Sequence, residues 1–164
     1  KNSLLEGSDE NIHEIIRYST FRLKEKNIIN IIEDFDPSLP LIRIDKNAMI
    51  QVFDNLFLNA KDALTNNNNA YIKISTKFVY GKTIKIPNLK NQIKKNYILV
   101  IIEDNGEGIN PSDLEKIFIP FFSNKKNGSG IGLFLVKKII DFHNGEISIK
   151  IEDNCTKVYI KLPL

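Results

Sequence analysis

The sequence contains few of the residues from which covalent or metal-based frameworks are built, and it has no long apolar run. Cys155 is the only cysteine, which excludes an internal disulfide or a site of several cysteine ligands and fits a reducing, cytoplasmic compartment. The longest uninterrupted apolar run, residues 97–102, is far too short to cross a membrane. The chain opens on Lys1 without an initiator methionine or a signal peptide, so we expect a piece of a longer protein, whose own membrane attachment stays open.

The chain also carries little net charge. Its formal charge of +3 does not indicate a nucleic-acid partner, and no stripe of interleaved basic and aromatic residues is present. Hydrophobic residues make up 42% of the chain and charged residues 26%, which is the balance of a globular domain. A length of 164 residues suffices for one domain with a single core.

The strongest helical pattern spans residues 45–64. A narrow band of this helix carries Gln51, Asn55, Asn59 and Asp62. Because asparagine and aspartate weaken a helix interior, the band favours side-chain oxygens aimed at a ligand such as a hard cation, with ordinary solvation as the alternative. The opposite face is apolar and predicts contact with a core; it consists of Met49, Val52, Phe53, Leu56, Ala60, Ala63 and Leu64.

Shorter patterns occupy the rest of the chain. Residues 1–10 look loose and residues 12–27 form an amphipathic helix, so we expect an N-terminal segment and linker helix over 1–27 and the main domain over 28–164. The predicted strands cover residues 28–35, 41–44, 71–78, 97–103, 146–151 and 156–162.

Local signals mark the ends of several helices and one long connection. Asp45 is a natural N-cap for the helix of residues 45–64. Asn110 is expected to cap a short helix over 111–117, and a further apolar helix is expected over 134–143. Residues 79–96 form a lysine-rich connection, which favours a solvated hairpin extension over a docking surface.

Three polar segments follow the strand of residues 97–103. Residues 103–109 place a carboxylate at the strand end before two glycines, which allow a tight turn and the close approach of a flat group; an ordinary acidic turn is the alternative. Residues 118–127 join an aromatic anchor to a polar, basic run, as expected of a lid on a fixed base. Residues 128–133 contain three glycines at a helix start, where backbone N–H groups can bind phosphate.

The order and spacing of these segments resemble those of a known family. The helix reads Gln-x-x-x-Asn-x-x-x-Asn-Ala-x-Asp-Ala, and Asp-Asn-Gly-Glu-Gly-Ile, Phe-x-Pro-Phe-Phe-Ser-Asn-Lys and Gly-Ser-Gly-Ile-Gly-Leu follow in turn. From about residue 28 to its end, the chain resembles the ATP-binding catalytic domain of bacterial two-component sensor histidine kinases. This domain belongs to the GHKL (HATPase_c) superfamily, with gyrase, MutL and the heat-shock chaperone ATPases. The aromatic segment and the short lid are most similar to the nitrogen-regulation branch of these kinases.

The resemblance implies an α/β two-layer sandwich of the Bergerat type, in which helices cover one face of a mixed, mostly antiparallel sheet. ATP would lie between the central helix and the lid. By position, Asn59 and Asn55 would be the Mg²⁺ ligands, and Lys125 would neutralise the γ-phosphate as the third catalytic residue. Asp104 would accept the adenine amino group. The other cofactor-binding positions that the resemblance implies are Gly106, Gly108, Ile109, Gly128, Ser129, Gly130, Ile131, Gly132, Leu133 and Thr156.

Two positions depart from the family pattern. Thr156 matches a threonine that often supports the adenine pocket, but the glycine that usually precedes it is Cys155 here. Asp62 stands where some sensor kinases carry lysine, and its role stays open.

The resemblance implies transfer of the γ-phosphoryl group of ATP to a histidine on a dimerisation and phospho-acceptor domain. An aspartate of a response regulator receiver domain would then take it. The parent would be a homodimer and this piece a monomer. The alternatives are a nucleotide-gated ATPase of the wider superfamily and a non-catalytic nucleotide-binding regulatory module. The neutral Asn55, where several of those ATPases carry a carboxylate base, favours the kinase.

Neither of the two histidines fits the family's acceptor motif, which is His-Glu followed by a basic residue and proline. His13 is followed by Glu14 and Arg17 but by no proline, and it lies too close to the central helix. We interpret His13 as an ordinary residue of the linker helix. His143 is interpreted as a residue favourable at a helix C-terminus because of the helix dipole.

Overall fold

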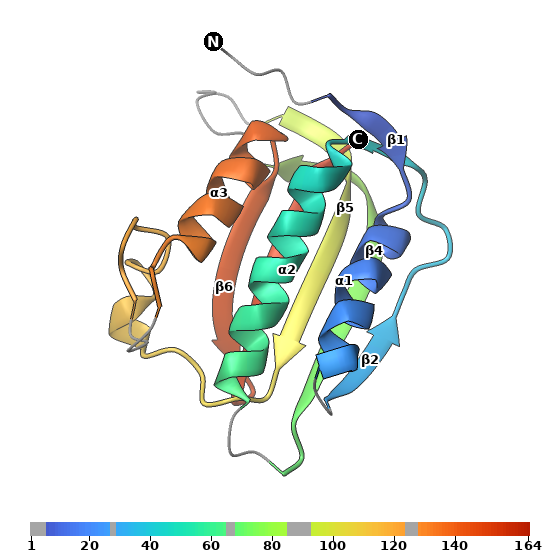
Figure 1. Cartoon of the computed structure of the whole chain (residues 1–164). Helices are drawn as coiled ribbons and strands as arrows, with labels where there is room; N and C mark the ends of the chain where they lie inside the picture. Colours follow the sequence, from blue (N-terminus) through green and yellow to red (C-terminus); the bar gives the residue numbers. More distant parts are fainter. Residues whose placement is uncertain (1–5, 27–28, 65–67, 85–92, 124–127) are drawn as a thin grey trace.

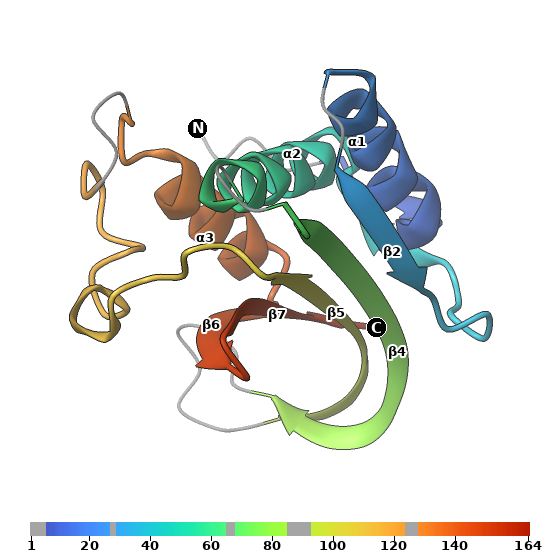
Figure 2. The same ribbon diagram turned by 90° about the horizontal axis from the view of Figure 1, so that it is seen from below.

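A computed structural model describes residues 6–26, 29–64, 68–84, 93–123 and 128–164. Within these residues, three α-helices cover one face of a five-stranded sheet, which makes two layers (Figures 1 and 2). In chain order, the elements are β1 (Ser8–Glu10), α1 (Ile12–Lys26), β2 (Asn30–Asp34), β3 (Ile42–Ile44), α2 (Lys46–Ala63), β4 (Tyr71–Ile84), β5 (Ile93–Asp104), the 3₁₀ turn η1 (Pro111–Asp113), α3 (Gly132–Phe142), β6 (Glu146–Glu152) and β7 (Cys155–Pro163). The expected two-layer α/β sandwich is confirmed.

The main sheet has the strand order β2-β4-β5-β7-β6. β2 runs parallel to β4 and the other neighbouring pairs are antiparallel, so the sheet is mixed and mostly antiparallel, as expected. β1 pairs with β3 in a separate two-stranded sheet. The expectation that residues 1–10 are loose is therefore wrong for Ser8–Glu10. Their pairing partner, Ile42–Ile44, lies so far along the chain that no local pattern reveals it.

The hairpin of β4 and β5 is longer than the sequence predicts. The predicted strands stop at Phe78 and resume at Tyr97, whereas the ladder continues to the pair of Ile84 and Ile93 after an irregularity at residues 79–82. Strand pairing therefore occupies both ends of the lysine-rich connection, which agrees with an extension of the hairpin. The residues that extend the two strands, among them Lys82, Thr83, Lys94 and Lys95, gave no alternation of apolar and polar residues from which to predict this pairing.

The hydrophobic core lies between the sheet and the helices. The apolar face predicted for residues 45–64 is buried over most of its length, with Phe57 added to it and Ala63 only partly covered. On the strands, every second residue points toward the helices, as the period of two requires. In the main sheet, the residues of this buried cluster are Ile72, Ile74, Ile98, Val100, Ile102, Ile147, Val158, Ile160 and Leu162.

α1 belongs to the same core, although its residues were expected to form a linker helix ahead of the domain. Ile12, Ile15 and Ile16 are at most 1% exposed and join the buried cluster formed with α2 and the sheet. α1 lies beside α2 (Figure 1), and an ion pair of 2.7 Å between Arg22 and Asp54 links the two helices. An apolar face on a helix indicates burial but does not say which domain provides the partner surface.

The helix boundaries follow local chemistry closely. Oδ1 of Asp45 accepts a hydrogen bond of 2.8 Å from the Ala48 N–H group, which confirms the predicted N-cap of α2. Oδ1 of Asn110 likewise accepts from the Ser112 N–H group, but only the 3₁₀ turn Pro111–Asp113 forms where a helix to residue 117 was expected. Among the described residues, no helix is long and apolar enough to span a membrane.

Candidate functional site

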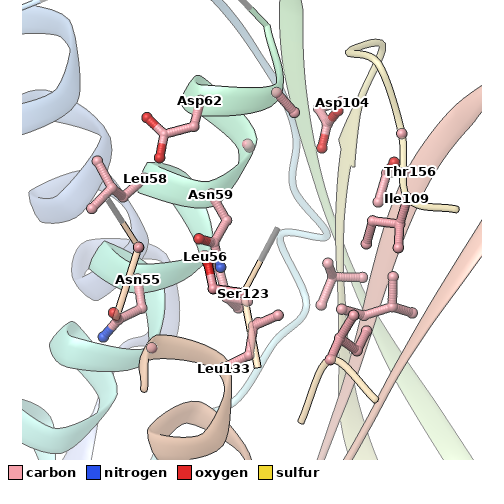
Figure 3. Close-up of a pocket in the computed structure, with 18 of the residues that line it drawn as sticks. Asn55, Leu56, Leu58, Asn59, Asp62, Asp104, Ile109, Ser123, Leu133 and Thr156 are labelled. Atoms are coloured by element: carbon pink, nitrogen blue, oxygen red, sulfur yellow. The ribbon is translucent and has the colours of Figure 1, made fainter. Parts of the chain in front are cut away.

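A cavity of about 620 Å³ opens between the second half of α2, the start of α3 and the strands β5 and β7 (Figure 3). Gly106 and Ile131 lie beside this cavity without lining it, and Lys125 lies outside the described residues. The predicted site residues that line it are Asn55, Asn59, Asp104, Gly108, Ile109, Gly128, Ser129, Gly130, Gly132, Leu133 and Thr156. The fold thus gathers residues from four separate segments of the sequence around one space.

Asp104 and Thr156 form the polar point at the sheet end of the cavity. They are cross-strand partners on β5 and β7, and they are only 6% and 7% exposed. Oδ1 of Asp104 accepts a hydrogen bond of 3.0 Å from the Gly106 N–H group. Burial raises the pKa of the Asp104 carboxyl to about 6, although that hydrogen bond opposes the rise. Oγ1 of Thr156 is buried without a hydrogen-bond partner in the described part of the chain, a costly state that a bound ligand or water would relieve.

Apolar side chains surround this polar point, and sequence reasoning missed them as site residues. They come from the inner face of the sheet, from the segment that follows η1 and from the base of the predicted lid. An apolar space with a polar point at one end suits an aromatic ring that carries a hydrogen-bond donor. The signal for the strand residues was present in the period of two, because they alternate with outward-facing residues. The missed apolar residues are Ile102, Ile117, Phe122, Ile149 and Val158.

The turn after β5 is attached directly to the end of α2. The Glu107 N–H group donates a hydrogen bond of 3.0 Å to the carbonyl oxygen of Ala63, one of the last carbonyls of α2. An added Cβ at Gly106 would lie 2.4 Å from the same oxygen, so only glycine allows this approach. The Asp104 turn therefore keeps a defined distance from the polar face of α2, although Gly106 itself does not line the cavity.

The polar band of α2 faces the cavity along most of its length (Figure 3). Nδ2 of Asn55 donates a hydrogen bond of 2.8 Å to the Gln51 carbonyl oxygen, which fixes the orientation of the amide. Oδ1 of Asn55 then lies so close to the start of α3 that an added Cβ at Gly132 would be 2.9 Å from it. Asn59 and Asp62 line the cavity on the following turn, whereas Gln51 does not.

The start of α3 presents backbone amides to the same space. Ile131 occupies the N-cap position and makes no side-chain cap hydrogen bond, while its own N–H group donates to Oγ of Ser129 at 3.4 Å. The amides of the first helical turn carry the partial positive charge of the helix and attract anions. Amide oxygens on α2 and amide N–H groups on α3 therefore meet at one end of the cavity.

The base of the predicted lid is tightly built. The Phe121 N–H group donates a hydrogen bond of 3.1 Å to the carbonyl oxygen of Gly130. An added Cβ at Gly130, whose φ is +69°, would lie 2.4 Å from the carbonyl carbon of Phe121. Phe121 itself has a φ of +66°, an unusual conformation for a side chain of its size. This close contact brings the two ends of the segment from Phe122 to Ser129 together at the rim of the cavity.

His13 lies at another corner of the domain. Its ring stacks on Phe35 with centroids 4.4 Å apart, and its Nε2 lies 2.7 Å from Oγ1 of Thr76. Burial and the nearby Arg17 lower the pKa of His13. These contacts join α1 to β2 and β4 and agree with a structural role for His13.

Helices cover one face of the mixed sheet, and the polar band of α2 faces the glycine-rich start of α3. This arrangement is that of a nucleotide-binding α/β sandwich. Residues 44–164 match the family model for histidine kinase-, DNA gyrase B- and HSP90-like ATPases. The chain belongs to this ATPase family, and the sequence-based identification of an ATP-binding domain of the histidine kinase type is confirmed.

The similar proteins point to one branch of the family. The chain is 40% identical over 135 residues to the sensory histidine kinase/phosphatase NtrB of Rhodobacter capsulatus, covering 82% of this chain and 37% of that protein. It is 32% identical over 156 residues to NtrB of Rhizobium leguminosarum bv. phaseoli, covering 93% of this chain and 40% of that protein. The catalytic domain of the histidine kinase ThkA is 28% identical, with a TM-score of 0.79 and coverage of 96% of this chain and 95% of that one. The chain therefore spans 40% or less of the length of these two NtrB relatives.

Proposed function

We propose that this domain binds Mg²⁺-ATP and donates its γ-phosphoryl group to a histidine on another domain of the same parent protein. The observation that supports this proposal most is that one cavity has two chemically different ends, one suited to a base and the other to phosphates. One end offers a desolvated Asp104 carboxylate beside the unsatisfied Thr156 hydroxyl. The other end offers the amide oxygens of α2 opposite the uncapped start of α3.

Asp104 accepts the adenine amino group in this proposal. One carboxylate oxygen already binds the Gly106 N–H group, and the other is left for a donor from the ligand. The Thr156 hydroxyl completes the polar point, directly or through a water. Gly108, with a φ of +79°, and Ile109 bring backbone and an apolar side chain to the ring without crowding it.

The phosphates lie at the α3 end, where negative charge is stabilised by the helix N-terminus. Ser129 and the glycines of residues 128–132 supply backbone and hydroxyl donors, Ile131 and Leu133 fix the start of the helix, and Lys125 on the lid would neutralise the γ-phosphate. The donor set fits Mg²⁺, because the amides of Asn59 and Asn55 are hard, neutral oxygen ligands. Held by these two residues, Mg²⁺ would supply positive charge that neutralises part of the charge of the triphosphate.

Transfer to a protein histidine is favoured over hydrolysis by water. Several relatives in the wider superfamily place a carboxylate base where this chain has Asn55, and an amide cannot accept a proton. Nδ2 of Asn55 is moreover committed to the Gln51 carbonyl oxygen. Phosphoryl transfer needs mainly positioning and charge neutralisation, which the cavity residues provide.

The acceptor histidine and the later partners lie outside this chain in our proposal. His13 is packed on Phe35 and bonded to Thr76, which agrees with its not being the acceptor. The names of the NtrB relatives support a parent that is a two-component sensor kinase. Its partners would be its own dimerisation domain and a response regulator receiver domain, all in the cytoplasm, with the isolated piece a monomer.

The test uses γ-labelled ATP and two proteins, this domain and the acceptor region of its parent. We expect no acid-labile phosphate on the domain alone, and rapid labelling of the acceptor when both are mixed with Mg²⁺. Acid-labile phosphate on His13, or release of phosphate to water without labelling of the acceptor, would contradict the proposal. Calorimetry with a non-hydrolysable ATP analogue measures the binding step separately.

A further inference from the structure

His143 joins the end of α3 to the beginning of α2. Its Nδ1 lies 2.7 Å from the carbonyl oxygen of Ile139, in the last turn of α3. Its Nε2 lies 3.1 Å from the backbone nitrogen of Asp45, which is the N-cap residue of α2. The imidazole is therefore a bridge between the two helices that line the cavity, and it lies at the end of α3 remote from the cavity.

The two partners assign the proton on this ring. A backbone N–H group can only donate, so Nε2 must accept from Asp45 with its lone pair. A carbonyl oxygen can only accept, so Nδ1 must carry the proton that is donated to Ile139. The bridge thus requires the neutral Nδ1–H tautomer. His143 occupies the C-cap position of α3, and the N–H group that it donates to one of the last carbonyls agrees with its interpretation as a residue favourable at a helix C-terminus.

The opposite end of α3 tolerates little displacement. α3 has 11 residues, so its two ends lie about 16 Å apart. An added Cβ at Gly132 would be only 2.9 Å from Oδ1 of Asn55, which shows how closely the helix start approaches the polar band of α2. A small shift of α3 along its axis would change the distance between its first amides and the amide oxygens of α2.

Specific contacts at the C-terminal end define where α3 lies. Its buried apolar side chains pack on the core, but apolar contact is non-directional and sets the position along the axis weakly. The hydrogen bond between His143 and Asp45 is directional. Next to it, an added Cβ at Gly145 would lie 2.7 Å from the carbonyl oxygen of Lys161, so β7 holds the same end from the other side.

We propose that His143 is a positioning residue for the triphosphate. Its bridge keeps α3 in register with α2, so that the first amides of α3 and Oδ1 of Asn55 face the same ligand. The inference rests on the proposed function, because it concerns the phosphate end of that site. Adenine would bind on β5 and β7, so loss of the bridge should weaken the binding of ATP and leave the binding of adenosine almost unchanged.

The experiment compares three variants with the wild-type domain. His143→Ala removes both hydrogen bonds, whereas His143→Gln keeps an oxygen that can accept from the Asp45 N–H group. His13→Gln changes the other histidine of the chain, which lies far from the cavity, and serves as the control. Thermal unfolding checks that each variant is folded. Calorimetry measures the affinities for ATP and for adenosine, and ¹⁵N NMR of the imidazole reads the tautomer of His143.

We expect His143→Ala to weaken ATP binding about tenfold, the loss of about one hydrogen bond, with less than about a twofold change for adenosine. His143→Gln should recover most of the ATP affinity, and His13→Gln should match the wild type. Equal losses for ATP and adenosine, or equal losses in the Gln and Ala variants, would overturn the inference. So would a proton on Nε2. A wild-type domain that binds neither nucleotide would instead contradict the proposed function, while the tautomer would still test the bridge.

Discussion

The two ends of the cavity are built by different means. The sheet end consists of paired strands and a turn that is hydrogen-bonded to Ala63, and its polar groups on Asp104 and Thr156 are almost fully buried. The helix end consists of side chains on α2 and of the start of α3, and Gly128, Ser129 and Ile131 there are exposed. Backbone pairing makes the sheet end rigid, whereas the helix end depends on how two helices and a loop are placed.

Because the two ends of the cavity are built differently, mutations should be able to disturb base recognition and phosphate binding separately. A change at the sheet end should weaken adenosine and ATP alike, because both carry the base. A change at the helix end should weaken ATP alone. The ratio of the two affinities therefore reports which end has been disturbed.

The largest effect is expected for Asp104→Asn. Loss of a charged acceptor costs roughly 1.5–3 kcal/mol, so the affinities for ATP and adenosine should both fall about tenfold to a hundredfold. Asp34→Asn, an exposed carboxylate at the end of β2, is the matched control and should change neither affinity. Equal ATP affinity of Asp104→Asn and wild type in calorimetry would remove Asp104 from base recognition.

Gly130→Ala should weaken ATP about tenfold and spare adenosine. The added Cβ would lie 2.4 Å from the carbonyl carbon of Phe121 and must displace the base of the lid. Gly81→Ala is the control, because Gly81 also has a positive φ but an added Cβ there meets nothing within 4 Å. Backbone strain is thus present in both variants, and only the collision differs. Similar ATP affinities for the two variants would show that the contact with Phe121 is unimportant.

Asn59→Ala should reduce the dependence of ATP binding on Mg²⁺ rather than binding as such. Without the metal, the variant and the wild type should bind ATP equally; with saturating Mg²⁺, the wild type should bind several-fold more tightly, about 1 kcal/mol. Titrations with and without a chelator make this comparison. If the wild-type advantage persists when the metal is removed, Asn59 contacts the nucleotide itself.

The last prediction concerns the stability of the apo domain and its dependence on pH, rather than ligand affinity. The folded-state pKa of Asp104 is about 6, above the ordinary value of 3.8, so the folded protein binds more protons than the unfolded chain between these values. The ionised carboxylate therefore destabilises the apo domain above pH 6, and this cost, on the order of 3 kcal/mol, disappears as the pH falls from 6 to 4.

The Asp104→Asn variant removes this cost and provides the reference. Urea unfolding should find the apo variant more stable than the wild type at pH 8, with a difference that shrinks by pH 4. ATP affinity of the wild type should fall as the pH drops below 6, because adenine needs the ionised acceptor. A stability difference independent of pH would show that the Asp104 carboxyl is not desolvated as described.

The sequence by itself determined the family, the fold class and the order of the site segments. These features depend on local chemistry: Asp45 caps its helix through a hydrogen bond three residues away, and the apolar face of residues 45–64 follows the helical period. The spacing of the asparagines and of the glycines can be recognised in the sequence without knowing which residues pack against them. The apolar lining from Ile102 and Val158 was also present in the strand pattern, although it was not assigned to the site.

Only the tertiary structure decided which distant segments meet. The pairing of β1 with β3, the burial of α1 in the core, the contact of Gly106 with Ala63 and the bridge from His143 to Asp45 all join residues that are separated in sequence. Their partners are set by the register of strands and the packing of helices across the whole domain. A single sequence carries no periodic or capping signal for such contacts, because the energy that selects them arises only when the chain is folded.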